Sequence, residues 1–200
     1  MSDQELEIEA ELEEESEPGP PALEPEVAAR RREALRFVRK WGDPVLRARA
    51  IEVDRFDDDL RSEVSRMGQL MEAALGVGLA ATQVGVPHRV LVYRAVPDGP
   101  LQALVNPVIE WSSRDEETLE EGCLSLPSVL VDVERPLYIR VSARDEFGEE
   151  ILVEASGFEA RVIQHEVDHL DGVLILDRIP RSERKEAMRG LREALAATDE

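Results

Sequence analysis

The chain has 200 residues and a mass of 22.4 kDa, the size of one domain with a tail. No run of residues approaches the roughly 20 apolar residues that a membrane span needs, and the N-terminus lacks the basic start of a secretory signal, so we expect a cytoplasmic protein. A formal net charge of −20 argues against a direct nucleic-acid groove, because phosphate contacts need clustered cations.

The first 26 residues form an acidic segment. They contain eleven Asp or Glu residues and no Lys or Arg, whereas the remaining 174 residues carry 33 acidic and 24 basic residues. This one-signed charge and the proline-rich end of the segment predict a disordered acidic arm at residues 1–26. We expect a solvated tail there, with a partner-binding segment as the alternative, and a folded domain over residues 27–200.

Two helices are expected before the first strand. Residues 27–40 switch to basic side chains and predict a short helix. A stronger helix is predicted over residues 57–75, because its apolar residues repeat every three or four positions. Asp57 or Asp58 can cap its start, and Gly76 is expected to end it.

Strands and helices then alternate in groups. Short β-branched runs between Gly, Pro and Asp turns predict strands at residues 89–96, 101–111, 137–144 and 150–155, with the last two joined as a hairpin. Helical spacing returns over residues 157–172, where Phe158, Val162, Val167 and Leu170 are expected on the apolar face, and over residues 181–197. Strands grouped between helices predict an α+β fold with a mostly antiparallel sheet.

An H-E-x-x-H pattern lies in the helix predicted over residues 157–172. His165 and His169 are four residues apart and share one helix face, so both imidazoles can reach a single metal ion. Glu166 lies roughly 100° around the helix and can face a bound water. Two exposed helix histidines would be the alternative. The third histidine, His88, follows a proline and is expected at the surface.

The third metal ligand decides the class of hydrolase. In a metzincin it would be a His at the position of Ile175, so that class is excluded. A zinc endopeptidase of the gluzincin type would use a downstream glutamate, for which the candidates are Glu183, Glu186 and Glu193. Cys123, the single cysteine, is the other candidate and lies in EGCLSLP between predicted strands; its alternative is an inert buried thiol.

A glycine-rich segment, GVGLAATQVGVP, covers residues 76–87. Its small residues leave the backbone open to close approach by a ligand, and Gln83 offers an amide donor. The segment lacks the Gly-Lys-Ser/Thr of a phosphate loop, and a turn without a function is the alternative.

Three motifs in this order resemble those of the peptide deformylases: GVGLAATQ at residues 76–83, EGCLS at 121–125 and QHEVDHLDG at 164–172. The resemblance covers roughly residues 42–180. It implies a peptide deformylase-like fold, in which the sheet packs around a central metal-binding HExxH helix. It also implies a hydrolase that removes the formyl group from the N-terminal formylmethionine of newly synthesised proteins.

The resemblance assigns a role to each motif. The implied ligands of one divalent metal ion are Cys123, His165 and His169. Fe²⁺ is favoured, and Zn²⁺, Ni²⁺ or Co²⁺ suit the same donor atoms. Glu166 is the implied base for attack by a metal-bound water, while the Gln83 amide and the Leu124 backbone N–H stabilise the oxyanion.

Further residues are implied for substrate binding and support. The formyl-Met peptide would bind as an added strand against residues 76–78 (Gly76, Val77 and Gly78) and residues 123–125. Its methionine side chain would lie in an apolar pocket near Val77, Leu124 and Val162. Glu121 and Arg135 match positions that form an ion pair behind the metal site. A monomer with transient proximity to the ribosome, and with no membrane contact, is expected. The remaining alternative is a catalytically silent relative that acts as a binding protein.

Overall fold

The computed structural model describes residues 23–196. Four helices are present there: α1 (Pro25–Leu35), α2 (Asp58–Ala73), α3 (Gly157–Leu170) and α4 (Arg181–Ala196). The strands are β1 (Gly78–Ala80), β2 (Val90–Tyr93), β3 (Gln102–Ser112), β4 (Glu116–Cys123), β5 (Leu126–Pro136), β6 (Tyr138–Arg144) and β7 (Glu150–Ser156). Three short 3₁₀ turns connect them: η1 (Pro44–Arg47), η2 (Ala81–Val84) and η3 (Ile175–Asp177).

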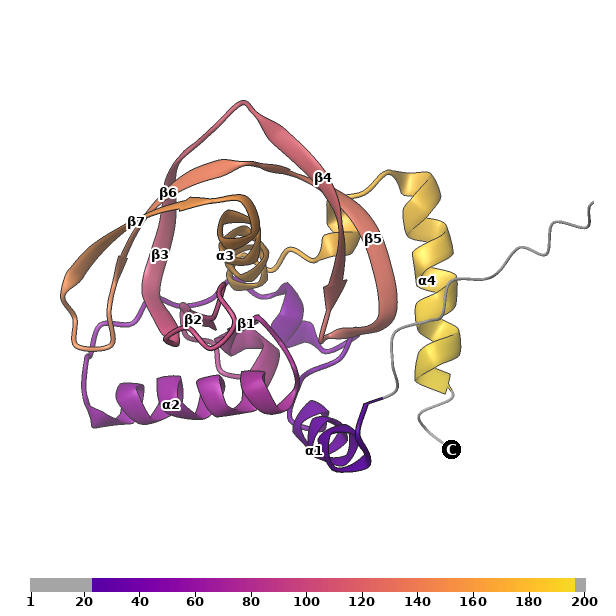
Figure 1. Cartoon of the computed structure of the whole chain (residues 1–200), viewed down its shortest axis with the longest axis horizontal. Helices are drawn as coiled ribbons and strands as arrows, with labels where there is room; N and C mark the ends of the chain where they lie inside the picture. Colours follow the sequence, from indigo (N-terminus) through magenta and orange to yellow (C-terminus); the bar gives the residue numbers. More distant parts are fainter. Residues whose placement is uncertain (1–22, 197–200) are drawn as a thin grey trace, which may run out of the picture.

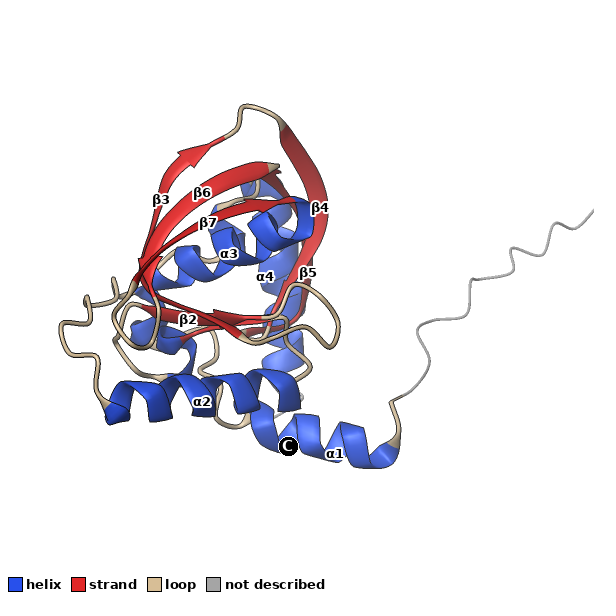
Figure 2. Cartoon of the chain, turned by 60° about the vertical axis from the view of Figure 1, so that its left-hand side comes forward, coloured by secondary structure: helices blue, strands red, loops and turns tan. Residues whose placement is uncertain are grey.

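The strands form two antiparallel sheets. One has five strands in the order β1-β2-β3-β6-β7, and the other is the β4–β5 hairpin. Both curve around α3, which lies inside the arc of strands in two views of the molecule (Figures 1 and 2). The expected α+β class, the mostly antiparallel sheet and the β6–β7 hairpin are therefore confirmed.

Helix α3 forms the centre of the core because almost every face of it is covered. Ile163 and Leu170 have no exposed surface, and they pack with side chains from β2, β3, β6 and β7. Phe158 was expected on this apolar face, but its side chain is 52% exposed. Phe158 lines a cavity beside α3 and does not join the buried cluster around the helix.

Helix α2 covers the opposite side of β1 and β2. Its cap is confirmed, since the Asp57 side chain accepts hydrogen bonds from the backbone N–H groups of Asp59 and Leu60. Its expected end is wrong: the helix stops at Ala73, and the left-handed conformation falls on Leu75, with φ +59°, rather than on Gly76. This places a leucine, 45% exposed, beside the glycine-rich segment.

The two ends of the described chain pack on the outside. Helix α1 begins at Pro25, inside the segment expected to be a disordered arm, because proline fits the first helical turn; residues 1–22 of that arm lie outside the described residues. Helix α4 packs against β5 through buried Leu191. Within residues 23–196, every helix is too short or too polar to cross a bilayer.

Candidate active site

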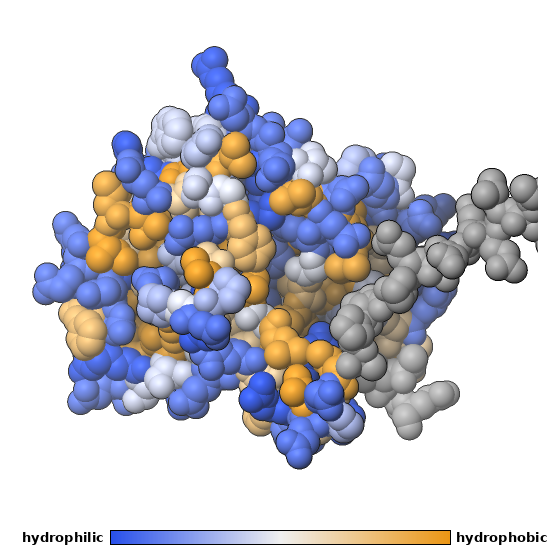
Figure 3. All heavy atoms as spheres, in the orientation of Figure 1, coloured by the Kyte–Doolittle hydropathy of each residue, from blue (hydrophilic) through white to orange (hydrophobic). Residues whose placement is uncertain are grey.

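A cavity of about 1060 Å³ opens between β1, the tip of the β4–β5 hairpin, α3 and α1. Its wall includes all five residues expected to bind substrate: Gly76, Val77, Gly78, Leu124 and Val162. On the face seen in Figure 3, hydrophobic side chains gather above α1, beside hydrophilic ones. The structure thus joins three motifs that are far apart in the sequence at one cavity.

The three expected metal ligands meet at one edge of this cavity. Ligand atoms of Cys123, His165 and His169 all lie within 4.8 Å of one another. Cys123 Sγ is 3.2 Å from His169 Nε2, and the two imidazole rings are 5.0 Å apart between centroids. Both histidines come from one face of α3, one turn apart, as the i, i+4 spacing predicts.

Cys123 reaches the histidines from a hairpin, where we had expected a loop between strands. It is the last residue of β4, and a two-residue turn, Leu124–Ser125, leads into β5. The pairing register shifts there, since Gly122 pairs with Leu130 and Cys123 with Leu126, so the extra residues lie on β5. The Cys123 thiol at this irregular tip faces the histidines of α3.

The donor set fits a divalent metal ion. Burial alone would raise the pKa of the Cys123 thiol, but His169 and His165 outweigh it and hold this pKa well below its usual range. The thiolate is the form that binds a metal. One thiolate and two imidazoles are ligands that suit Zn²⁺, Fe²⁺, Co²⁺ and Ni²⁺.

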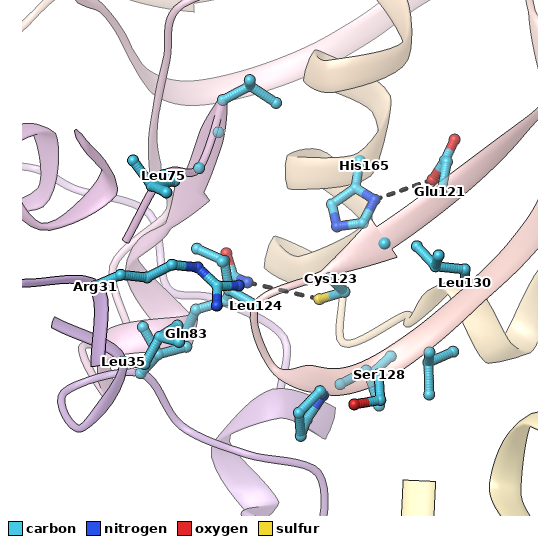
Figure 4. A pocket seen from close by; sticks show the side chains of 18 of the residues that line it. Arg31, Leu35, Leu75, Gln83, Glu121, Cys123, Leu124, Ser128, Leu130 and His165 are labelled. Atoms are coloured by element: carbon cyan, nitrogen blue, oxygen red, sulfur yellow. Dashed lines mark hydrogen bonds and ion pairs between the residues drawn. The ribbon is translucent and has the colours of Figure 1, made fainter. Parts of the chain in front are cut away.

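The expected Glu121–Arg135 pair lies directly behind His165. Arg135 Nε and Nη2 donate to the two Glu121 oxygens at 2.6 and 2.9 Å, and His165 Nδ1 lies 3.0 Å from Glu121 Oε2 (Figure 4). Burial would raise the pKa of Glu121, but the hydrogen bonds from His165 and Arg135 lower it to about 2. The carboxylate therefore orients the imidazole so that Nε2 is left for a metal ion.

Two further buried residues complete this network, and the sequence analysis missed both. Arg161 Nη1 donates to Glu121 Oε1 at 2.7 Å, and Arg135 Nη1 donates to Asp168 Oδ2 at 2.9 Å. A signal was present, because Arg161 is one helical turn before His165 and Asp168 lies between the two histidines. That spacing predicts that these side chains lie near His165 on α3. It does not predict their partners, Glu121 and Arg135, which come from β4 and β5.

Glu166 lines the cavity with an unpaired oxygen. Its side chain is buried, and Oε2 has no hydrogen-bond partner among the described residues. Burial raises the pKa of Glu166 above the ordinary range of a glutamate. A Cβ built on Gly78 would lie 2.4 Å from Glu166 Oε1, so only glycine fits between β1 and this carboxylate.

The Gln83 side chain has a defined direction. Its Oε1 accepts a hydrogen bond from the Ala80 backbone N–H at 2.8 Å, which fixes which end of the amide is the oxygen. The Nε2 donor then faces Ser125 Oγ at 3.3 Å and Cys123 Sγ at 3.8 Å (Figure 4). The Gln83 N–H donor therefore points toward Cys123, one of the three expected metal ligands.

Residues 39–41 connect the Gln83 turn to the hairpin tip. The Arg39 backbone N–H donates to Gln83 O at 2.7 Å, and the Trp41 N–H donates to Ser125 O at 2.9 Å. Between them, Lys40 Nζ donates to Leu124 O at 2.9 Å. Burial lowers the pKa of Lys40. This segment holds both loops in one relative position.

The endopeptidase alternative is wrong for this chain. Glu183, Glu186 and Glu193 are exposed on α4, and the group of ligand atoms near His165 and His169 contains Cys123 instead. His88 does not line the cavity; it is partly exposed, and its Nδ1 lies 2.8 Å from Glu63 Oε2.

Comparisons with known proteins show the family of this chain. The polypeptide deformylase family model matches residues 35–185. The chain is 45% identical to a peptide deformylase of Acidothermus cellulolyticus over 161 residues, covering 80% of this chain and 88% of that one. It is 48% identical to peptide deformylase 1 of Corynebacterium glutamicum over 157 residues, covering 78% and 93%.

Solved structures give the same result. A peptide deformylase from Synechococcus elongatus in complex with actinonin is 45% identical, with a TM-score of 0.73 over 76% of this chain and 85% of that one. One from Legionella pneumophila is 35% identical, with a TM-score of 0.77 over 81% and 96%. The chain therefore belongs to the polypeptide deformylase family, and it removes the formyl group from the N-terminal methionine of newly made proteins.

Proposed function

We propose that Cys123, His165 and His169 hold one divalent metal ion and that Glu166 transfers the protons of deformylation. The observation that carries this assignment is the convergence of the three ligand atoms within 4.8 Å beside a buried, unpaired Glu166 oxygen. Fe²⁺ is the proposed working ion, by resemblance to the family, and Zn²⁺, Ni²⁺ or Co²⁺ suit the same donors. When bound, such an ion supplies Lewis-acid assistance and a water of lowered pKa.

Glu166 is placed to move the proton in both directions. As water adds to the formyl carbon, the Glu166 carboxylate takes a proton from it. The bond from the formyl carbon to the methionine nitrogen then breaks, and Glu166 returns the proton to the departing amine. Formate and a free N-terminal amine are the products.

Gln83 and Leu124 stabilise the charge that develops on the formyl oxygen. The Gln83 Nε2 donor is held in place by the bond from Ala80 to its Oε1, and the Leu124 backbone N–H lies at the hairpin tip. Donors that are already oriented need no rearrangement during the reaction, and losing one typically costs about 3 kcal/mol of barrier.

The peptide backbone binds along residues 76–78, the segment that leads into β1. Strand β1 is the outer one of the five-stranded sheet, so an extended peptide can pair with Gly76, Val77 and Gly78 beside it. Leu124 and Val162 then face the methionine side chain across the cavity. Recognition through the main chain suits an enzyme that accepts many sequences after methionine.

We further propose a monomer that acts in the cytoplasm, where it meets nascent chains in transient proximity to the ribosome.

Formate release from formyl-Met-Ala-Ser tests the assignment, using protein purified without oxygen and loaded with Fe²⁺ or Ni²⁺. We expect turnover by the full chain. Glu166→Gln should lose turnover while its metal content stays unchanged. Glu183→Gln is the control and should keep turnover, because it removes an exposed carboxylate on α4. Turnover that survives Glu166→Gln would overturn the proposed proton transfer, and an equal loss in both variants would show a general effect of removing charge.

A further inference from the structure

Helix α1 lines the cavity, although all but its last residue, Leu35, precede the part of the chain that matches the family model. Its contribution to the wall includes Ala28, Arg31, Arg32 and Leu35. Their spacing of three or four residues puts them on one face of the helix. Arg31 and Leu35 are seen at the side of the cavity opposite His165 in Figure 4. The face of α1 that lines the cavity therefore carries two arginines, Arg31 and Arg32.

The segment that precedes β1 runs from the catalytic residues to this face. At one end, Gly78 lies against Glu166. At the other end, Arg31 Nε donates to Ala74 O at 3.3 Å. A peptide paired antiparallel to this segment, with its formyl group at Glu166, would place its first residue near Gly78 and its third and fourth residues near α1, because antiparallel strands advance one residue for one.

The two arginines have capacity for a ligand. Arg36, on the next turn, already pairs with Glu33 at 3.0 Å. Arg32 is exposed, and neither Arg31 nor Arg32 forms an ion pair within residues 23–196. Guanidinium groups bind carboxylates through parallel hydrogen bonds. We propose that α1 is a specificity wall, on which Arg31 and Arg32 favour formyl-Met peptides with acidic side chains at the third and fourth positions.

This inference rests on the proposed function, so the test separates the two. The substrates are amidated peptides of the form formyl-Met-Ala-X-X, with X as Glu, Gln or Lys. Turnover of the Gln peptide by the metal-loaded full chain reports on the function itself. Binding of dye-labelled Glu and Lys peptides to the metal-loaded Glu166→Gln protein, measured by fluorescence anisotropy, reports on the wall whether or not turnover occurs.

We expect the Glu peptide to bind about tenfold more tightly than the Lys peptide, a difference that two exposed ion pairs can supply. This ratio should fall when 0.5 M NaCl is added. In the same Glu166→Gln background, Arg31→Gln and Arg32→Gln should each lower the ratio about threefold. Arg31→Lys keeps the charge and should keep most of the preference. Arg30→Gln is the matched control, since it removes one charge from a face of α1 that does not line the cavity.

Two results would overturn the specificity wall. One is a Glu-to-Lys ratio near one in the protein that retains both arginines. The other is a ratio that falls as much in Arg30→Gln as in Arg31→Gln and Arg32→Gln, which would mean that the net charge of the chain, and not the position of these arginines, sets the preference.

Discussion

Arg135 holds the Glu121 carboxylate through two parallel hydrogen bonds, from Nε to Oε1 at 2.6 Å and from Nη2 to Oε2 at 2.9 Å, and both side chains are buried. Because Glu121 Oε2 also bonds His165 Nδ1, this pair sets the orientation of an imidazole that faces the metal position. The geometry of the proposed metal site therefore depends on a residue that is not one of its three proposed ligands.

Replacing Arg135 by alanine should weaken both folding and metal binding. The change leaves Glu121 and Asp168 buried with fewer partners, and breaking a buried ion pair costs about 3–5 kcal/mol. Thermal unfolding of the apoprotein and metal content after dialysis measure the two effects. Arg140→Ala is the control, because its pair with Glu154 is exposed and such pairs contribute about 1 kcal/mol or less. Equal behaviour of the two variants would contradict a supporting role for Arg135.

Cys123→Ala should abolish tight metal binding. The substitution leaves two imidazoles as ligands, too few for a stable site. Metal content by mass spectrometry should fall from one per chain to a small fraction, while Glu186→Gln, on exposed α4, should keep its full content. Retention of one tightly held metal ion by Cys123→Ala would mean that a different third ligand is used.

Gly78→Ala should lower kcat/KM by about a hundredfold, since a misplacement of about 1 Å in an active site can cost that much. The new methyl group would lie 2.4 Å from Glu166 Oε1 and must displace the carboxylate or β1. Gly190→Ala is the matched control: a Cβ there meets nothing within 4 Å, and alanine in a helix stabilises by about 0.5–1 kcal/mol. An active Gly78→Ala variant would show that Glu166 has room to move.

Asp177→Asn should destabilise the protein at neutral pH but not in acid. Burial would raise the pKa of Asp177, but hydrogen bonds from Arg47 and the Leu174 N–H outweigh it and hold this pKa below the usual range of an aspartate. A lowered folded-state pKa gives stability that is present above the unfolded value and is lost as the pH falls through the folded value.

The difference in unfolding free energy between wild type and Asp177→Asn should thus be constant from pH 7 to about 5 and shrink below about 4. Urea unfolding at each pH measures it. Asp132→Asn is the control, because Asp132 is exposed on β5 and forms no ion pair within residues 23–196. A difference that grows toward acid would reverse the sign and contradict the prediction.

Local spacing in the sequence determined the parts of the site that lie on one element. The period of the helix alone places His165 and His169 on one face, and Asp57 caps α2 as its position before an apolar repeat predicts. The β6–β7 hairpin follows from two β-branched runs around a Gly turn. In each case the residues that interact are close in the sequence, so their geometry follows from backbone periodicity.

Strands β1, β4 and β5 were missed: β1 and β4 carry no hydrophobic alternation, whereas β5 does alternate, with Val129, Val131 and Val133 buried, and its period was overlooked. Strand β1 has only three residues, too few to show a period. Strand β4 reads EETLEEGC, and its one buried position is Glu121, a charged residue that is stable inside only because Arg135 and Arg161 meet it there. Sequence patterns predict buried strands from their apolar residues. The buried residue of β4 is charged, so its sequence is read as a loop.

Tertiary structure decided everything that joins distant segments. Cys123 lies more than 40 residues from His165, and their meeting depends on the register shift at the hairpin tip and on the packing of the β4–β5 hairpin beside α3. The place of α1 beside the cavity likewise follows from its contacts, such as the bond from Arg31 to Ala74. Such contacts have no period in the sequence, because their geometry is set by how whole elements pack against one another and not by the spacing within any one of them.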